Sequence, residues 1–387
     1  MKIDALTLFK NLYGNNQNST QPLCFSSSGR VNIIGEHIDY NGGYVLPVAI
    51  DMACRIYCIK NDLNRMRVAY TTTEFRGEID YKSLDSYRDA EYINYIAGVL
   101  KVLSDEHYTL QGLDVVYDIG VPFGSGLSSS AAIEVATGYM MSYFAGVDIY
   151  RTKLALQAQK AENEYVGVNC GIMDQFASAN GKKDCAILLD CATLNFEHIP
   201  FKLENHSLYI INTNRPHNLK ESKYNERRQE CEDALAFINE NIDVKYKHLC
   251  EITPDEFDNL AKEMPQNLYE RATHCVYEQQ RVIDATIAMK SGDVESLGKL
   301  LTQSHESLRD LYKVSCFELD TIVDILSKDS RVSGARMTGG GFGGCCVAII
   351  KNGSQDLLDN LLVEYKNKTG LDADVYVARI DDGARMM

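Results

Sequence analysis

The hydrophobic and polar positions in the first half of the chain predict short strands mixed with helices. From Leu113 to Ile119, apolar residues alternate with Asp114, Val116 and Asp118, which is the two-residue period of a strand with one buried face. A Gly/Ser-rich turn follows, and residues 128–144 are predicted to form a helix. Further strands are expected at residues 54–60, 67–72 and 185–190, and a further helix at residues 152–165. This mixture indicates an α+β first half.

The second half of the chain is predicted to contain long helices. They are expected at about residues 223–240, 266–290, 294–303 and 305–328, with strands at 208–212, 336–338, 346–350 and 375–380. A chain of 387 residues exceeds the usual size of one hydrophobic core. Because the polar segment 203–207 separates the two patterns, we place a domain boundary near residue 205. The expected domains are residues 1–205 and 206–387.

Composition and charge exclude several classes of protein. Residues 1–10 carry charges within an apolar run, which is typical of an amphipathic helix and not of a signal peptide. No apolar stretch reaches the roughly 18 residues that cross a bilayer. The formal charge of −15 opposes binding to nucleic acid or to an anionic membrane surface. The twelve cysteines include no CxxC pair, so reduced thiols in the cytoplasm are expected.

The segment Gly120–Ala132, with the sequence GVPFGSGLSSSAA, predicts a phosphate-binding loop. Gly124 and Gly126 let the backbone approach an anion, and the hydroxyls of residues 128–130 are expected to cap the next helix. The N–H groups and the dipole of that helix favour negative charge. No Walker A lysine is present, so amides, a hydroxyl and a divalent cation would hold the phosphates. An ordinary strand–turn–helix junction is the alternative interpretation.

A second polar cluster lies within Gly29–Pro47, where Arg30, Glu36, His37 and Asp39 stand between apolar strands. Carboxylates and an imidazole exchange hydrogen bonds with neighbouring hydroxyls, so a sugar or polyol is the indicated ligand. A polar hairpin turn around residues 41–43 is the alternative interpretation.

The glycine-rich segment Gly334–Cys345 formally contains a GxGxxG pattern. It precedes a predicted strand and opens no helix, and only residues 345–387 follow it, which argues against a dinucleotide fold. A loop that approaches a bound group is the better interpretation, and a purely structural loop is the alternative. Glu162 and Asp174 could supply the metal ligand and the group near the attacking hydroxyl that phosphoryl transfer needs. Taken alone, Glu162 would be assigned to a solvated helix face.

Three segments together resemble the signature motifs of the GHMP small-molecule kinases. Gly29–Pro47, Gly120–Ala132 and Met337–Cys345 follow the order of those motifs, and the first resembles the galactokinase signature. The resemblance implies a two-domain α+β fold with a ribosomal-S5-like N-terminal domain and an active site in the interdomain cleft. The C-terminal domain would be ferredoxin-like, with a last strand that could return to the first domain. The implied reaction transfers the γ-phosphoryl group of ATP to the anomeric (C1) hydroxyl of D-galactose.

The resemblance also implies roles for individual residues. Asp174 matches the residue that contacts the reacting hydroxyl, and Arg30 matches the charge-stabilising residue beside it. The matched sugar-binding positions are Glu36, His37, Asp39, Gly171 and Tyr224. The matched ATP-binding positions are Gly124, Ser125, Gly126, Leu127, Ser128, Ser129 and Ser130, with Ser130 and Glu162 as ligands of Mg²⁺. The implied partners are therefore ATP, Mg²⁺ and a small sugar, with no nucleic acid, no membrane and no obligate protein partner.

Two positions bear on the choice of sugar. Ile38 stands where many bacterial galactokinases have Thr, and an Ile at this position resembles the N-acetylgalactosamine kinases and the fungal branch. Phe342, by contrast, stands where the N-acetylgalactosamine kinases tend to have Trp. An N-acetylgalactosamine 1-kinase is therefore the substrate-level alternative. Some relatives are non-catalytic sensors of galactose and ATP, which resemble galactokinases altered in the serine–alanine part of the phosphate loop. Residues 128–132 are intact here, which favours catalysis.

Overall fold

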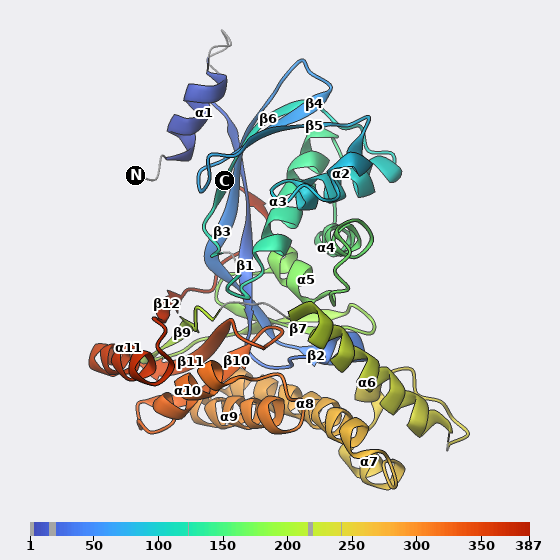
Figure 1. Cartoon of the computed structure of the whole chain (residues 1–387), viewed down its shortest axis with the longest axis vertical. Helices are drawn as coiled ribbons and strands as arrows, with labels where there is room; N and C mark the ends of the chain where they lie inside the picture. The colour runs from blue at the N-terminus through green and yellow to red at the C-terminus, as the bar shows by residue number, and fades with distance from the viewer. Residues whose placement is uncertain (1–3, 15–20, 123, 216–219, 241) are drawn as a thin grey trace.

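The computed structural model describes residues 4–14, 21–122, 124–215, 220–240 and 242–387, with the backbone alone for residues 220–222. Two lobes are stacked along the long axis of the molecule (Figure 1). The upper lobe is built on a six-stranded sheet, and the lower lobe on a four-stranded sheet with helices packed against it. Within the described residues, no helix is long and apolar enough to cross a membrane.

The upper sheet has the strand order β13-β1-β3-β6-β4-β5. Neighbouring strands are antiparallel except for the parallel pair β4 and β6. The terminal strand β13 pairs with β1 at Phe25 and Ser26, so the end of the chain returns to the upper lobe. The strands are β1 (Leu23–Asn32), β3 (Pro47–Lys60), β4 (Arg65–Tyr70), β5 (Arg76–Asp80), β6 (Leu113–Ile119) and β13 (Arg385–Met386).

Helices cover both faces of this sheet. One face carries α2 (Asn94–Asp105), α3 (Ser129–Phe144) and α5 (Met173–Asn180), with α4 (Arg151–Lys160) packed on α3 and α5. The amphipathic helix α1 (Ala5–Tyr13) begins at Asp4, whose carboxylate accepts from the N–H groups of Leu6 and Thr7. Leu8 and Phe9 of α1 pack on Val116 from the opposite side of the sheet. The predicted N-terminal amphipathic helix is therefore confirmed from Ala5 onward, and residues 1–3 of the predicted span lie outside the described residues.

The predicted strand at residues 113–119 is confirmed as β6, but the prediction that it is half-buried is wrong, because α1 covers the face that the alternation assigned to solvent. Val116 is buried under α1. Asp114 is also buried, and its carboxylate oxygens accept from Arg67 at 2.6 and 2.5 Å. The alternation thus marks a strand with two covered faces, one of which holds an ion pair.

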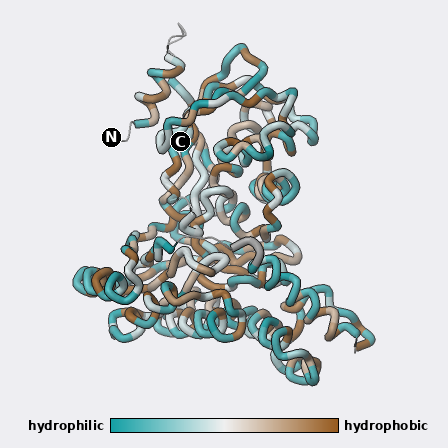
Figure 2. Tube along the Cα trace, in the orientation of Figure 1, coloured by the Kyte–Doolittle hydropathy of each residue, from teal (hydrophilic) through white to brown (hydrophobic). Residues whose placement is uncertain are grey.

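The lower sheet has the order β10-β11-β9-β12 and is antiparallel throughout. Its strands are β9 (His206–Asn212), β10 (Val332–Thr338), β11 (Cys345–Lys351) and β12 (Asp374–Ala378). Helices α6 (Lys220–Glu240), α7 (Pro254–Leu260), α8 (Gln266–Ser291), α9 (Val294–Asp310) and α10 (Phe317–Leu326) connect β9 to β10, and α11 (Gln355–Thr369) connects β11 to β12. This is the ferredoxin-like β-α-β-β-α-β arrangement. The outer helices alternate hydrophilic and hydrophobic residues, as amphipathic helices do (Figure 2).

Three further strands lie near the junction of the lobes and form a small sheet, β2 (Tyr44–Val45), β7 (Cys185–Asp190) and β8 (Phe196–Pro200). The predicted helix over residues 152–165 is α4 followed by a π-helical segment, Ala161–Val166. The predicted helix 305–328 is wrong in its bounds, because α9 continues to Asp310 and α10 begins only at Phe317. The helices α2, α5, α7 and α11 are not predicted from the sequence pattern. All twelve cysteines are free thiols.

Candidate active site

The loop between β6 and α3 has the backbone of an anion-binding nest. Gly124, Gly126 and Ser128 have left-handed φ angles of 70°, 78° and 62°. A Cβ added at Gly124 or Gly126 would meet no atom within 4 Å, so the loop is open on that side. Alternating left-handed residues turn successive N–H groups toward a shared concavity, which binds phosphate oxygens. Phe123 lies outside the described residues.

Not every residue of this loop offers its side chain to a ligand. The Ser125 hydroxyl donates to the carbonyl of Pro122 at 2.7 Å, and the Leu127 side chain is buried in the core. These two residues could therefore contribute only main-chain groups. Ser129 and Ser130 begin helix α3.

The expectation that the Ser128 hydroxyl caps α3 is wrong. Ser128 occupies the N-cap position, yet its left-handed backbone removes the side chain from the cap, and it makes no capping hydrogen bond. Its hydroxyl instead donates to Oδ2 of Asp174 at 2.5 Å. The loop is thereby tied to the candidate catalytic carboxylate.

Arg30 and Asp174 form an ion pair beside the phosphate loop. The Arg30 guanidinium donates from Nε to Oδ1 of Asp174 at 2.7 Å and from Nη2 to Oδ2 at 2.5 Å. Its third contact runs from Nη1 to the carbonyl of Gly126 at 2.7 Å. Arg30 is 4% exposed, whereas the Asp174 side chain is 29% exposed and open to a ligand. The bidentate geometry fixes the carboxylate in one orientation.

Gly29 permits this arrangement. A Cβ at residue 29 would lie 2.7 Å from the carbonyl oxygen of Leu127, so only glycine lets β1 pass this close to the loop. The same carbonyl accepts from the Arg30 N–H at 3.2 Å.

Glu162 is not on a solvated helix face, because it is buried in the π-helical segment beside α5. Gln175 donates from Nε2 to Glu162 at 2.5 Å and to Glu134 at 3.2 Å. Burial, followed by the nearby Asp174 charge, raises the pKa of Glu162 to about 7. Burial, followed by the Glu162 charge, raises the pKa of Glu134 well above its usual range. The Ser130 hydroxyl also hydrogen-bonds to Glu162.

Sequence reasoning misses Glu134 and Gln175, although Ser130 and Glu134 have the i, i+4 spacing of one helix face. Among the described residues, no group of three His, Cys, Asp or Glu side chains could hold a metal ion. A nucleotide-bound Mg²⁺ needs only one or two protein ligands, because phosphates and waters supply the rest. A hydroxyl and a buried carboxylate beside an anion nest fit that requirement.

Asp39 and Gly171 are in close contact across the site. A Cβ at residue 171 would lie 1.7 Å from Oδ2 of Asp39, so no larger residue fits there without displacing the carboxylate. Burial, followed by the Asp174 charge, raises the pKa of Asp39 to about 7. Asp39 and Asp174 thus interact electrostatically within one site.

His37 and Tyr224 lie together on the lower-lobe side of the site. Their ring centroids are 5.5 Å apart, and Tyr224 reaches His37 from α6. His37 has a left-handed φ of 63°, which is uncommon for a residue other than glycine.

Glu36 links the sugar motif to the third motif. It is buried and accepts from the Thr338 hydroxyl at 2.9 Å and from the Gly339 N–H at 2.7 Å. Nη2 of the buried Arg336 lies 3.2 Å from its carboxylate. The glycine-rich loop joins the antiparallel strands β10 and β11, so the argument against a dinucleotide fold is confirmed.

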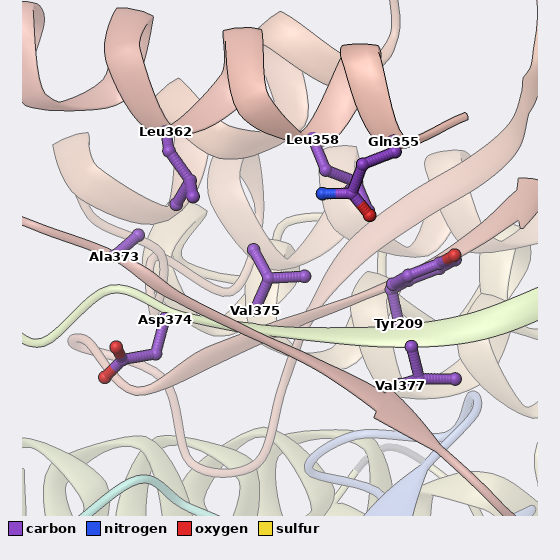
Figure 3. Close-up of a pocket in the computed structure, with 8 residues that line it drawn as sticks. All are labelled: Tyr209, Gln355, Leu358, Leu362, Ala373, Asp374, Val375 and Val377. Atoms are coloured by element: carbon purple, nitrogen blue, oxygen red, sulfur yellow. The ribbon is translucent and has the colours of Figure 1, made fainter. Parts of the chain in front are cut away.

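A separate hollow of about 310 Å³ lies between α11 and the edge strand β12 (Figure 3). Leu358 and Leu362 of α11 face Val375 of β12 across it. None of the candidate site residues lines this hollow.

The fold and the site together define a small-molecule kinase of the GHMP type. The model of the GHMP kinases N terminal domain matches residues 94–182, the model of the GHMP kinases C terminal domain matches residues 285–361, and the galactokinase galactose-binding signature matches residues 7–60. A galactokinase of Fusobacterium nucleatum is 43% identical over 93% of this chain and 94% of its own length. A galactokinase of Clostridium perfringens is 42% identical over 99% of both chains. The chain belongs to the galactokinase family.

Solved structures agree with this assignment. The crystal structure of Lactococcus lactis galactokinase complexed with galactose has a TM-score of 0.93 and 35% identity, and the match covers 99% of this chain and 98% of that one. The mevalonate kinase of Methanococcus jannaschii has a TM-score of 0.66 at 19% identity over 94% of this chain and 100% of its own, and shares the fold. The predicted family and the predicted two-domain α+β fold class are confirmed.

Proposed function

We propose that this chain transfers the γ-phosphoryl group of ATP to the C1 hydroxyl of D-galactose, giving α-D-galactose 1-phosphate and ADP. This reaction is the first committed step of galactose use. The observation that carries the proposal is the Arg30–Asp174 ion pair, which is held against the phosphate loop through Gly126 and Ser128.

Asp174 and Arg30 are the catalytic residues of this proposal. The Asp174 carboxylate accepts a hydrogen bond from the C1 hydroxyl and thereby orients its oxygen toward the γ-phosphorus. As the bond from O1 to phosphorus forms and the bridging bond to the β-phosphate breaks, the hydroxyl proton passes to Asp174. A loose transition state requires little proton removal beforehand, so Asp174 acts mainly by orientation and by late proton acceptance. Arg30 holds the carboxylate and adds positive charge beside the transferring group.

The phosphates of ATP are held by the loop from Gly124 to Ser130. Its main-chain N–H groups and the N-terminus of α3 face the anion, and they do so without a Walker A lysine. Ser130 and Glu162 would hold Mg²⁺, which would supply charge neutralisation at the phosphates when bound. The buried Glu134 and Gln175 orient Glu162.

The sugar is recognised in this proposal by His37, Asp39, Tyr224 and the Gly171 main chain, with Glu36 behind them. These groups offer hydrogen bonds on several sides of a polyol. Gly171 could contribute only its backbone, which lies against Asp39. The partners are accordingly ATP, Mg²⁺ and galactose. Twelve free thiols suit a reducing compartment, and we place the reaction in the cytoplasm.

The test of this function is sugar-dependent ADP release with Mg²⁺ and ATP, measured with galactose, with N-acetylgalactosamine and without sugar. We expect ADP release that depends on galactose. A preference for N-acetylgalactosamine would reassign the substrate, and ADP release that no sugar stimulates, despite sugar binding, would indicate a sensor. The comparisons favour galactose, because the curated relatives named above are galactokinases.

A Glu162→Gln variant tests the metal site. The raised pKa means that the folded protein binds this proton more tightly than the unfolded chain, so unfolding free energy falls as pH rises from about 4.5 to about 7. In metal-free protein, Glu162→Gln should therefore narrow the difference in melting temperature between about pH 5.5 and about pH 8. It should also lower activity at fixed Mg²⁺ by at least about tenfold.

The matched control is Glu164→Gln, which removes a carboxylate from the same segment where the side chain is 67% exposed. That variant should change neither the pH dependence of melting nor the Mg²⁺ requirement. If both variants behave alike, Glu162 is not the metal ligand.

A further inference from the structure

A line of hydrogen-bonded side chains runs from the interior of the lower lobe to His37. Cys231 Sγ lies 3.0 Å from the Tyr312 hydroxyl, which lies 2.9 Å from the Tyr40 hydroxyl. The Tyr40 hydroxyl in turn lies 2.8 Å from Nδ1 of His37. Cys231 is on α6 and Tyr312 follows α9, whereas Tyr40 and His37 belong to the sugar motif. Segments far apart in the sequence thus converge on one ring nitrogen.

The protons of this line can be counted. Burial raises the pKa values of Tyr40 and Tyr312 well above the usual range of a tyrosine, so each hydroxyl keeps its proton. Each hydroxyl has one proton to donate, and it therefore donates in one direction only. The donations along the line must all point toward His37 or all point away from it.

The chemistry of the two ends favours donation toward His37. In that direction the line ends on Nδ1, a strong acceptor when the imidazole is neutral. In the opposite direction it ends on the sulfur of Cys231, a weak acceptor when it is a thiol. Cys231 is buried, and a thiolate there would bear the cost of desolvation and of the nearby Glu230 carboxylate. Hydrogen bonds from Cys275 and Tyr312 oppose that cost and lower the pKa of Cys231. A thiolate at Cys231 would be a strong acceptor and would favour the opposite direction, so the NMR measurement described below must exclude it.

We propose that Tyr40 and Tyr312 are positioning residues that hold His37 in the tautomer with its proton on Nε2, so that His37 is a hydrogen-bond donor to a sugar hydroxyl. The proposal rests on the proposed function, because it takes His37 as a sugar contact. Tyr312 and Tyr224 also pack against the His37 ring, at centroid distances of 4.8 and 5.5 Å. These contacts support its left-handed backbone, so the donor is oriented before the sugar arrives and less ordering is needed on binding.

Tyr40→Phe and Tyr312→Phe test the consequence for the sugar. Tyr40→Phe removes the donor to Nδ1 and should raise KM for galactose about tenfold, with kcat and KM for ATP nearly unchanged. Tyr312→Phe leaves the Tyr40–His37 contact in place, so it should raise KM for galactose less than Tyr40→Phe does. Tyr117→Phe is the control, because it removes another buried tyrosine hydroxyl, bonded to Thr137 at 2.9 Å. The control should leave KM for galactose unchanged.

The tautomer itself is measured by nitrogen NMR of histidine-labelled full-length protein without sugar, at about pH 8, where an ordinary histidine is neutral. The His37 signals are those lost in His37→Gln. We expect a protonated Nε2 and an unprotonated Nδ1 in the native protein, and a mixture in Tyr40→Phe. A proton on Nδ1 in the native protein would overturn the proposal and indicate the reversed line.

The two measurements separate this proposal from the function on which it rests. The tautomer is observable even if galactose is not the substrate. If the tautomer is as expected but Tyr40→Phe leaves KM for galactose unchanged in an active kinase, the positioning role fails and the kinase function stands.

Discussion

An Asp174→Asn variant is expected to lose kcat by about a hundred- to ten-thousandfold while it still binds ATP. The substitution keeps the shape of the side chain but removes the charge that accepts the C1 hydroxyl proton and pairs with Arg30. ATP binding should persist, because the loop offers main-chain N–H groups to the phosphates and the asparagine side chain keeps an oxygen that can accept from Ser128. Sugar-dependent ADP release measures kcat, and titration calorimetry measures ATP affinity.

The matched control for this prediction is Asp114→Asn. Asp114 forms an equally short bidentate pair with Arg67, on the far side of the upper sheet from the candidate site. Asp114→Asn should lower the melting temperature without changing kcat of the folded protein. Near-normal kcat in a folded Asp174→Asn variant would remove Asp174 from the catalytic role.

An Arg30→Lys variant should lose kcat by about a hundred- to a thousandfold. A lysine keeps the positive charge, but its compact ammonium group cannot hold both Asp174 oxygens and the Gly126 carbonyl in the planar fork that Arg30 makes. The carboxylate and the phosphate loop would then lose their common support. The measurement is kcat, with KM for ATP and for galactose determined separately.

Arg67→Lys provides the control, because it makes the same replacement in a structural ion pair. It should change stability and leave kcat as it is. A kcat for Arg30→Lys within a few-fold of the native value would show that charge alone suffices and that the fork geometry is not catalytic.

The sequence predicts the elements whose pattern is local. β7 lies where the pattern places it, at Cys185–Asp190, and α8 and α9 begin at their expected starts, Gln266 and Val294. Features that depend on packing between distant segments are not predicted from the local pattern. The second face of β6 is covered by α1, more than a hundred residues earlier in the chain, and alternation within β6 carries no information about that contact. The end of α9 and the start of α10 fall within one continuous predicted helical run, so periodicity alone places that boundary wrongly.

The same distinction applies to the candidate site, where the sequence predicts some residues but not their contacts. The resemblance predicts that Arg30, Asp174 and the phosphate loop belong to one site, and the structure brings them into contact. The partners of those residues are not predictable from spacing. Ser128 meets Asp174 only because its left-handed backbone turns the hydroxyl away from the helix cap. Glu162 continues the buried face of α4, at i+7 from Ala155 and i+4 from Ala158, so its charge and not its helical phase is what assigns it to solvent.

The proposed function requires phosphoryl transfer to the anomeric oxygen at the site around Arg30 and Asp174. The direct test is phosphorus NMR of the product formed from ATP, Mg²⁺ and galactose, with the native protein and Asp174→Asn side by side. We expect a new phosphate ester whose phosphorus couples to the anomeric proton, formed by the native protein and almost absent with the variant. An ester at another hydroxyl, inorganic phosphate alone, or equal product from both proteins would contradict it.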